Sequence, residues 1–181
     1  MPAFPVDIGT IAEEHGASIA VSGELAIDEL VLGQDHYPLR GPVTFDVTIA
    51  DTGNAYVAYG KALATVGAVC SRCLMEFDMP LEGEVDVYFV VPAHADEVPE
   101  EQDWALVEGS RVDLGPFVES ALAVALPLAP LHDEDCAGIC PVCGADRNEE
   151  PCDCVATDAN ESPFSVLARL HEVPGEEDTG S

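Results

Sequence analysis

The feature that most constrains this chain is a run of five cysteines between Cys136 and Cys154, with a distant pair upstream at Cys70-Ser-Arg-Cys73. A C-x-x-C turn brings two sulfurs toward one point, and two such pairs supply the tetrahedral set of ligands that zinc prefers. The proline after Cys140 and the glycine after Cys143 suit a tight turn, because proline fixes φ and glycine tolerates φ > 0. The sequence therefore predicts zinc binding.

Seven cysteines and one histidine could form one or two structural zinc sites. The candidate ligands are Cys70, Cys73, His132, Cys136, Cys140, Cys143, Cys152 and Cys154. The favoured division puts the last four on one ion, because they lie within fifteen residues and closing that loop costs little entropy. Cys70 and Cys73 then join Cys136, with His132 either a further ligand or a surface histidine. Four-ligand sites are closed to water, so catalytic zinc is not expected.

A second division of the ligands stays open. It joins Cys70 and Cys73 to Cys140 and Cys143 as a ribbon of two zinc knuckles. Cys152 and Cys154 are then left spare. The sequence favours the first division but does not exclude the second.

The charge of the chain limits its possible partners. It has 35 acidic and 6 basic residues, a formal net charge of −29, and Lys61 as its only lysine. Because non-specific nucleic-acid binding comes mainly from Lys and Arg neutralising phosphates, direct binding to RNA or DNA is not expected. An acidic surface suits a basic protein partner, although high solubility would explain the same composition.

The ends and apolar runs of the sequence indicate a cytoplasmic protein. Residues Met1–Asp7 lack the positive start and apolar run of a signal peptide, and no apolar stretch reaches membrane-spanning length. Thiols stay reduced in the cytoplasm, so clustered cysteines there favour metal binding over disulfides.

The sequence pattern in the middle of the chain predicts antiparallel strands. Apolar residues alternate with polar ones from Val43 to Ile49, which predicts a half-buried strand, and residues 51–54 predict a hairpin turn. A strand from Ala55 to Val69 follows, and residues 61–91 are interpreted as a long hairpin with Cys70 and Cys73 at its tip, their sulfurs directed outward. The alternative to metal binding for these two thiols is burial as small apolar side chains.

Other segments give weaker signals. Residues 8–14 suggest a helical turn, residues 24–32 one strand with a slip in its alternation, and residues 33–38 a turn. Residues 92–103 are rich in Asp, Glu and Pro and predict a loop. Two short runs at 104–107 and 111–114 predict a small hairpin.

Apolar residues at helical spacing predict a helix over about 115–126, with Pro116 in its first turn and Pro127 stopping it.

The expected fold is α+β: an antiparallel β-rich domain with one packed helix and a small cysteine-rich zinc-knuckle appendage. The predicted organisation is a core over 1–131, a zinc-binding segment with a short C-terminal helix over 132–171, and a disordered acidic tail over 172–181.

Four motifs resemble the YceD family, whose members are linked to accumulation of large-subunit ribosomal RNA. They are Cys70-Ser-Arg-Cys73, Ala125-Leu-Pro-Leu-Ala-Pro-Leu-His132, Cys140-Pro-Val-Cys143-Gly-Ala with Asn148 and Cys152-Asp-Cys154, and Ser162-Pro-Phe-Ser-Val-Leu-Ala-Arg-Leu170. The gene of this family often lies beside that of a small basic protein of the large ribosomal subunit. The resemblance therefore implies a ribosome-assembly factor with a basic ribosomal protein, or a large-subunit precursor, as its partner.

Two departures from that family bear on the site. Some relatives carry cysteine where this chain has His132, and histidine is an acceptable zinc ligand. Other relatives lack the cluster from Cys140 to Cys154, which favours a structural role for it.

The expected function is thus a non-enzymatic ribosome-biogenesis factor. The alternative is a regulatory protein or a zinc or thiol redox sensor, in which oxidation of the cysteines releases the metal. An enzyme is not expected, because the sequence has no nucleophile elbow, phosphate-binding glycine loop or paired-histidine zinc motif.

Overall fold

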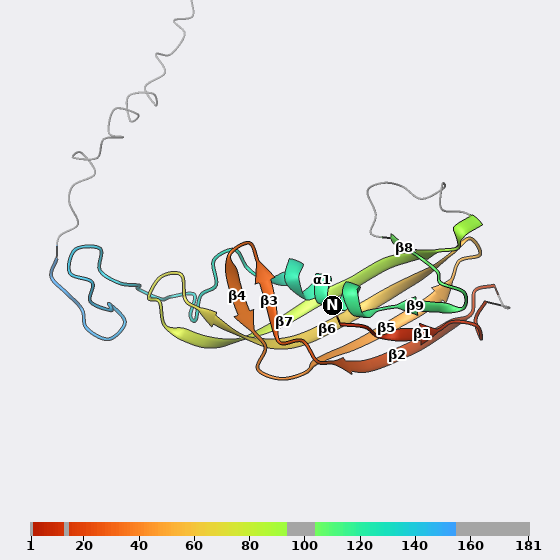
Figure 1. The fold of residues 1–181 in the computed structure, drawn as a ribbon. Coiled ribbons are helices and arrows are strands. Elements are labelled where there is room, and N and C mark those ends of the chain that lie inside the picture. Colours follow the sequence, from red (N-terminus) through yellow and green to blue (C-terminus); the bar gives the residue numbers. More distant parts are fainter. Residues whose placement is uncertain (1, 13–14, 94–103, 155–181) are drawn as a thin grey trace, which may run out of the picture.

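The computed structural model describes residues 2–12, 15–93 and 104–154, and they form a β-rich α+β fold (Figure 1). This confirms the fold class expected from the sequence. The short C-terminal helix and the acidic tail predicted beyond residue 154 lie outside the described residues, as does most of the loop expected at 92–103.

The main sheet has five strands in the order β2-β5-β6-β7-β8. Their bounds are β2 Ser18–Leu25, β5 Val43–Asp51, β6 Ala55–Val69, β7 Glu76–Val90 and β8 Trp104–Leu106. The first four are antiparallel, and β8 adds to β7 in parallel. The alternating apolar residues of β5, Val43, Phe45, Val47 and Ile49, are all buried on one face of the sheet.

Strands β6 and β7 form the long hairpin predicted from the sequence. They pair over fifteen residues each, from Ala55 opposite Val90 to Val69 opposite Glu76. One end of this ribbon therefore extends well past β5, whose pairing with β6 stops at Thr44 opposite Leu63. The cysteine-rich segment lies beside that end in Figure 1.

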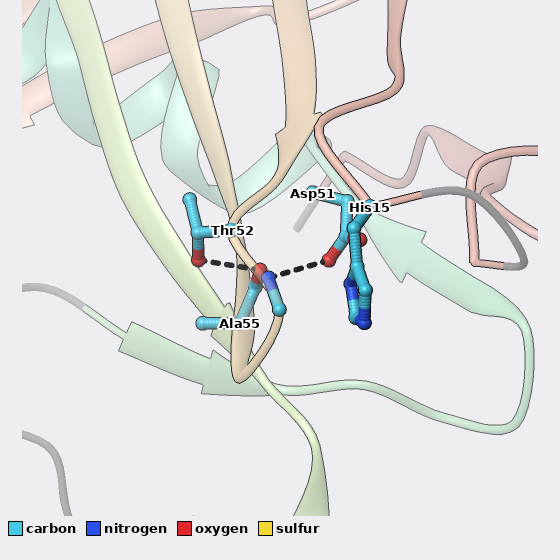
Figure 2. A network of polar contacts seen from close by, with 5 residues as sticks. His15, Asp51, Thr52 and Ala55 are labelled. Carbon is cyan, nitrogen blue, oxygen red and sulfur yellow. Dashed lines mark hydrogen bonds and ion pairs between the residues drawn. The ribbon is translucent and has the colours of Figure 1, made fainter.

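The turn between β5 and β6 is also confirmed (Figure 2). The Thr52 hydroxyl donates to the carbonyl oxygen of Ala55 at 2.8 Å, and the Asp51 carboxylate accepts from the Gly53 amide at 2.9 Å. Gly53 has φ 97°, a conformation that glycine adopts without steric cost. The second oxygen of Asp51 lies 3.2 Å from Nδ1 of His15.

Helix α1 (Gly115–Ala125) packs against β7, as the apolar face of the segment predicts. Val118 and Leu122 on the packed face of this helix are fully buried. The helix approaches the strand so closely at Gly83 that a Cβ there would stand 2.6 Å from the backbone of Ala121. Burial of this face, worth roughly 25 cal/mol per Å² of apolar surface, holds the helix in place.

The hairpin predicted over 104–114 is present only at its turn, and the predicted pairing of its two strands is wrong. Strand β8 pairs with β7, while β9 (Arg111–Asp113) forms a separate two-stranded sheet with β1 (Pro5–Asp7). A single bridge, Glu108 to Arg111, is all that joins the two runs. The short strands find backbone partners far away in the sequence, which local turn signals cannot reveal.

The single strand predicted over 24–32 is also wrong. Strand β2 ends at Leu25, and β3 (Glu29–Leu32) forms its own hairpin with β4 (Asp35–Pro38), so the predicted turn at 33–38 is confined to its start. The slip in the apolar alternation marked this boundary. At the N-terminus one helical turn is present, since the Ile8 carbonyl accepts from the amides of residues 11 and 12. Among the helices described, none is long and apolar enough to cross a membrane.

Candidate metal centres

The cysteines and His132 gather into two separate groups, each with its four candidate ligand atoms within 4.8 Å of one another. The first group, here the hairpin cluster, consists of Cys70, Cys73, His132 and Cys136. The second, here the loop cluster, consists of Cys140, Cys143, Cys152 and Cys154. The structure thus groups the side chains as the favoured division of the ligands predicts. His132 lies with the hairpin cluster.

The spacing inside the hairpin cluster suits a tetrahedral zinc ion. Two thiolates about 2.3 Å from zinc at the tetrahedral angle stand about 3.8 Å apart, and a thiolate and a histidine nitrogen about 3.5 Å. The sulfurs of Cys70 and Cys136 are 3.8 Å apart, and the Cys73 sulfur lies 3.4 Å from Nδ1 of His132. All seven cysteines are free thiols, so no disulfide competes for these ligands.

The first C-x-x-C turn is built by backbone hydrogen bonds. The Cys70 amide donates to the Met75 carbonyl at 2.9 Å, and the Leu74 amide donates to the Cys70 carbonyl at 2.9 Å. Leu74 has φ 64° and is the one residue other than glycine with a positive φ in the described part of the chain. The turn closes the β6–β7 hairpin and presents both thiols to one point.

The second C-x-x-C turn repeats this pattern seventy residues later. The Cys140 amide donates to the Ala145 carbonyl at 2.8 Å, and the Gly144 amide donates to the Cys140 carbonyl at 2.9 Å. Gly144 has φ 76°, matching the left-handed position of the first turn. The Val142 amide also donates to the Cys140 sulfur at 3.4 Å, which stabilises a thiolate there. Both turns are therefore knuckles of one backbone design.

Arg72 fastens the cysteine-rich segment to the hairpin tip. Its guanidinium donates to the carbonyl oxygens of Glu134 at 2.9 Å and Cys136 at 3.0 Å, and its own carbonyl accepts from the Ile139 amide at 3.0 Å. Gly138 has φ 69°, and a Cβ there would lie 3.0 Å from the Arg72 carbonyl oxygen. No sequence pattern predicts this role for Arg72, because its partners are backbone groups about sixty residues away.

Asn148 is a second residue that sequence reasoning left without a role. Its Nδ2 donates to the Cys136 sulfur at 3.4 Å, and its Oδ1 accepts from the Ala137 amide at 2.7 Å. The Asp146 carboxylate orients it by accepting from both the side-chain and the backbone nitrogen. Asn148 therefore supports a ligand of the hairpin cluster from the loop that carries the other cluster.

The two clusters differ in burial. In the hairpin cluster Cys70 is 0 % exposed, Cys136 5 % and Cys73 8 %, with Phe77 and Leu131 packed against them. The expectation that these sulfurs point outward is wrong, because Leu131 and Cys136 from the segment after α1 pack against both thiols. In the loop cluster Cys140 alone is buried, Cys152 is half-buried, and Cys143 and Cys154 are exposed.

Thiol ionisation in the hairpin cluster is uneven. Burial raises the pKa of the Cys70 thiol, but hydrogen bonds from the Cys73 backbone and from His132 outweigh burial and lower that pKa to about 5. The Met75 amide lowers the pKa of Cys73, yet burial and the neighbouring sulfurs of Cys70 and Cys136 raise it to about 11. Ionisation of Cys70 is therefore favoured, whereas ionisation of Cys73 is opposed by the charge of the neighbouring sulfurs.

The loop cluster shows the same pattern. Hydrogen bonds from the Cys143 and Val142 amides lower the pKa of Cys140 to about 6. The neighbouring thiols of Cys143 and Cys140, together with burial, raise the pKa of Cys154 to about 12. A divalent cation between the four sulfurs would remove this mutual repulsion, so the donor set fits a zinc ion.

The fold and the two clusters define a β-rich protein with paired cysteine knuckles at one end of a long hairpin. Residues 58–171 match the family model described as large ribosomal RNA subunit accumulation protein YceD, and the chain belongs to this family. The match confirms the resemblance noted in the sequence.

The chain is similar to mycobacterial proteins. It is 31% identical over 111 residues to the Uncharacterized protein Rv2926c of Mycobacterium tuberculosis, covering 59% of this chain and 52% of that protein. It is 28% identical over 112 residues to the Uncharacterized protein ML1660 of Mycobacterium leprae, covering 61% and 51%. The chain thus spans about half the length of the curated relatives it matches. No solved structure matches it at a significant level.

Proposed function

We propose that this protein is a non-enzymatic ribosome-biogenesis factor that supports accumulation of large-subunit ribosomal RNA by binding a basic ribosomal protein. The observation that carries the proposal is the family match over residues 58–171. The net charge of −29 supports the choice of partner, because an anionic protein is attracted to a cationic protein and repelled by RNA phosphates.

The distribution of charge on β7 supports a basic partner further. Five carboxylates occupy alternate positions on the exposed side of this strand: Glu76, Asp78, Glu82, Glu84 and Asp86. Two of them pair with the cations Arg40 and Lys61. The other three have no ion pair within the described residues, so this strand keeps a surplus of negative charge.

We further propose that each cluster holds one structural zinc ion, with Cys70, Cys73, His132 and Cys136 as one ligand set and the remaining four cysteines as the other. The sulfur spacing of 3.8 Å and the closed four-donor arrangement support this. Zinc would lock the cysteine-rich segment onto the hairpin and so shape the end of the molecule. The role is structural, since neither cluster leaves a fourth position open for substrate.

The proposed function is tested by purifying the tagged full chain from cells in low salt and identifying what accompanies it. We expect a basic protein of the large ribosomal subunit or a precursor particle. A parallel depletion of the protein should lower the ratio of large-subunit to small-subunit ribosomal RNA. Recovery of neither partner, with an unchanged ratio, would refute the proposal.

The loop cluster supports a second candidate, a thiol redox sensor. Cys143 and Cys154 are exposed, and the low pKa of Cys140 favours a reactive thiolate next to them. Oxidation would release the zinc of this cluster and loosen the segment after residue 136. This function requires that mild oxidation change partner binding as well as zinc content.

A further inference from the structure

The hairpin tip carries large apolar side chains that the fold leaves in solvent. Leu74 is 62 % exposed, Met75 46 % and Val69 49 %, all within one hairpin end. Scattered single apolar residues on a surface need no explanation, but several at one point mark an interaction site. These three residues are here called the tip residues.

Leu74 is unusual in backbone conformation as well as in exposure. Its φ of 64° lies in the left-handed region, where the Cβ of a residue other than glycine is sterically disfavoured. The same position in the second knuckle is Gly144, which meets the requirement without strain. A large apolar side chain held in a strained conformation and directed to water is a cost to folding, and such outliers gather at functional sites.

A groove of about 440 Å³ adjoins the tip residues. It runs between β4, the end of β6 and the segment after α1, and Val69, Ser71, Leu128 and Pro130 line it. Leu128 is 94 % exposed, so its side chain adds to the apolar surface. The groove can take an apolar side chain from a partner.

The charges around the groove specify that partner. The carboxylates of Asp35 and Glu76 line it, whereas its one arginine, Arg40, is already paired with Asp78 at 2.8 Å. A segment with lysine or arginine next to an apolar residue would place its cations on the acidic rim and its apolar side chain in the groove.

We propose that the tip residues and this groove are the surface that receives the basic ribosomal protein, which binds through an apolar side chain flanked by cations. This inference rests on the proposed function and adds where the partner binds. Methionine suits such a contact because its flexible, polarisable side chain adapts to the partner's shape. The knuckle turn and its zinc would then hold the contact residues in a rigid frame.

The test uses the full zinc-loaded chain as bait and the total protein extracted from purified large ribosomal subunits as prey. The retained protein is identified and its affinity measured against two variants. Leu74→Gly combined with Met75→Ser should weaken binding about tenfold or more, the range of an interface hot spot. The matched control is Val124→Ala on α1, an exposed apolar residue that is neither a tip residue nor part of the groove lining, which should change affinity less than about twofold.

A structural defect is separated from a lost contact by folding measurements on the same samples. Because glycine suits the left-handed position, Leu74→Gly alone should keep its zinc content and melt no lower than the parent chain. Weaker binding in a variant of unimpaired stability supports the proposal. Undiminished binding of the retained protein overturns it while leaving the proposed function intact. If the parent chain retains no ribosomal protein, both proposals fail.

Discussion

The hairpin cluster and the loop cluster use the same backbone turn, yet the protein holds them in different ways. The hairpin cluster joins Cys70 to Cys136, 66 residues apart, and is buried beneath the segment that follows α1. The loop cluster closes within fifteen residues and leaves Cys143 and Cys154 exposed. Loop length alone accounts for only about 1 kcal/mol of difference between them. The hairpin cluster differs further in its burial and in the hydrogen bonds that Arg72 donates to the segment that carries Cys136.

This difference indicates two separate tasks for one motif. The hairpin cluster connects the strands to the cysteine-rich segment, so its loss would separate two parts of the fold. The loop cluster shapes only its own segment and faces solvent, where it is open to oxidants or competing metals.

Removing one ligand from each cluster should have the largest effect. Cys70→Ser should lower the free energy of unfolding by more than about 4 kcal/mol, and Cys140→Ser by about 1–2 kcal/mol, because loss of a buried metal site is among the most destabilising changes. Each variant should retain about half of the parent's zinc. Thermal melting and elemental analysis of purified protein measure both quantities. Equal melting temperatures for the two variants would show that the clusters are equivalent.

Mild oxidation should act on the clusters in sequence. Hydrogen peroxide should release zinc first from the loop cluster, because its exposed thiolates are accessible, and several-fold more slowly from the buried hairpin cluster. A zinc-sensitive dye follows the release in Cys70→Ser and Cys140→Ser, each retaining one site. Faster release from the variant that keeps only the hairpin cluster would contradict the assignment based on burial.

Loss of the arginine contact should affect only the connection between hairpin and segment. Arg72→Ala should destabilise the protein by about 1–3 kcal/mol, since it leaves two backbone carbonyls without their charged donor. Arg72→Lys should recover only part of the lost stability, because lysine lacks the planar fork of donors of arginine. Denaturant unfolding measures the change. Arg147→Ala in the loop cluster serves as the control, as Arg147 is bonded through its backbone amide.

Exchanging the left-handed residues of the two turns should give the smallest effect. Gly144→Leu should destabilise the loop cluster by about 1 kcal/mol, the cost of a side chain in the left-handed conformation. Leu74→Gly should be neutral or slightly stabilising. The change in stability of each cluster is measured as the chelator concentration needed to remove zinc from each variant. A clear loss of stability in Leu74→Gly would mean that Leu74 serves the fold and not a partner.

Local patterns predicted the regular elements well. The alternation in β5, the turn at residues 51–54, the long β6–β7 hairpin and the packed helix α1 all follow from residue periodicity and turn chemistry, and all are present. The errors fell on short strands. Strands β1, β8 and β9 have three residues each, too few for periodicity to show, and their partners are distant in sequence.

The division of cysteines between the two groups could be argued from spacing, but their surroundings could not. Residue spacing and turn chemistry suffice to place the thiol pairs of the C-x-x-C turns at a hairpin tip and in a compact loop, because both act over a few positions. Burial of the first group, its contacts with Arg72 and Asn148, and the exposure of Leu74 arise only in the folded chain. Those features depend on the path by which the chain returns over the hairpin after α1, and no local pattern encodes that path.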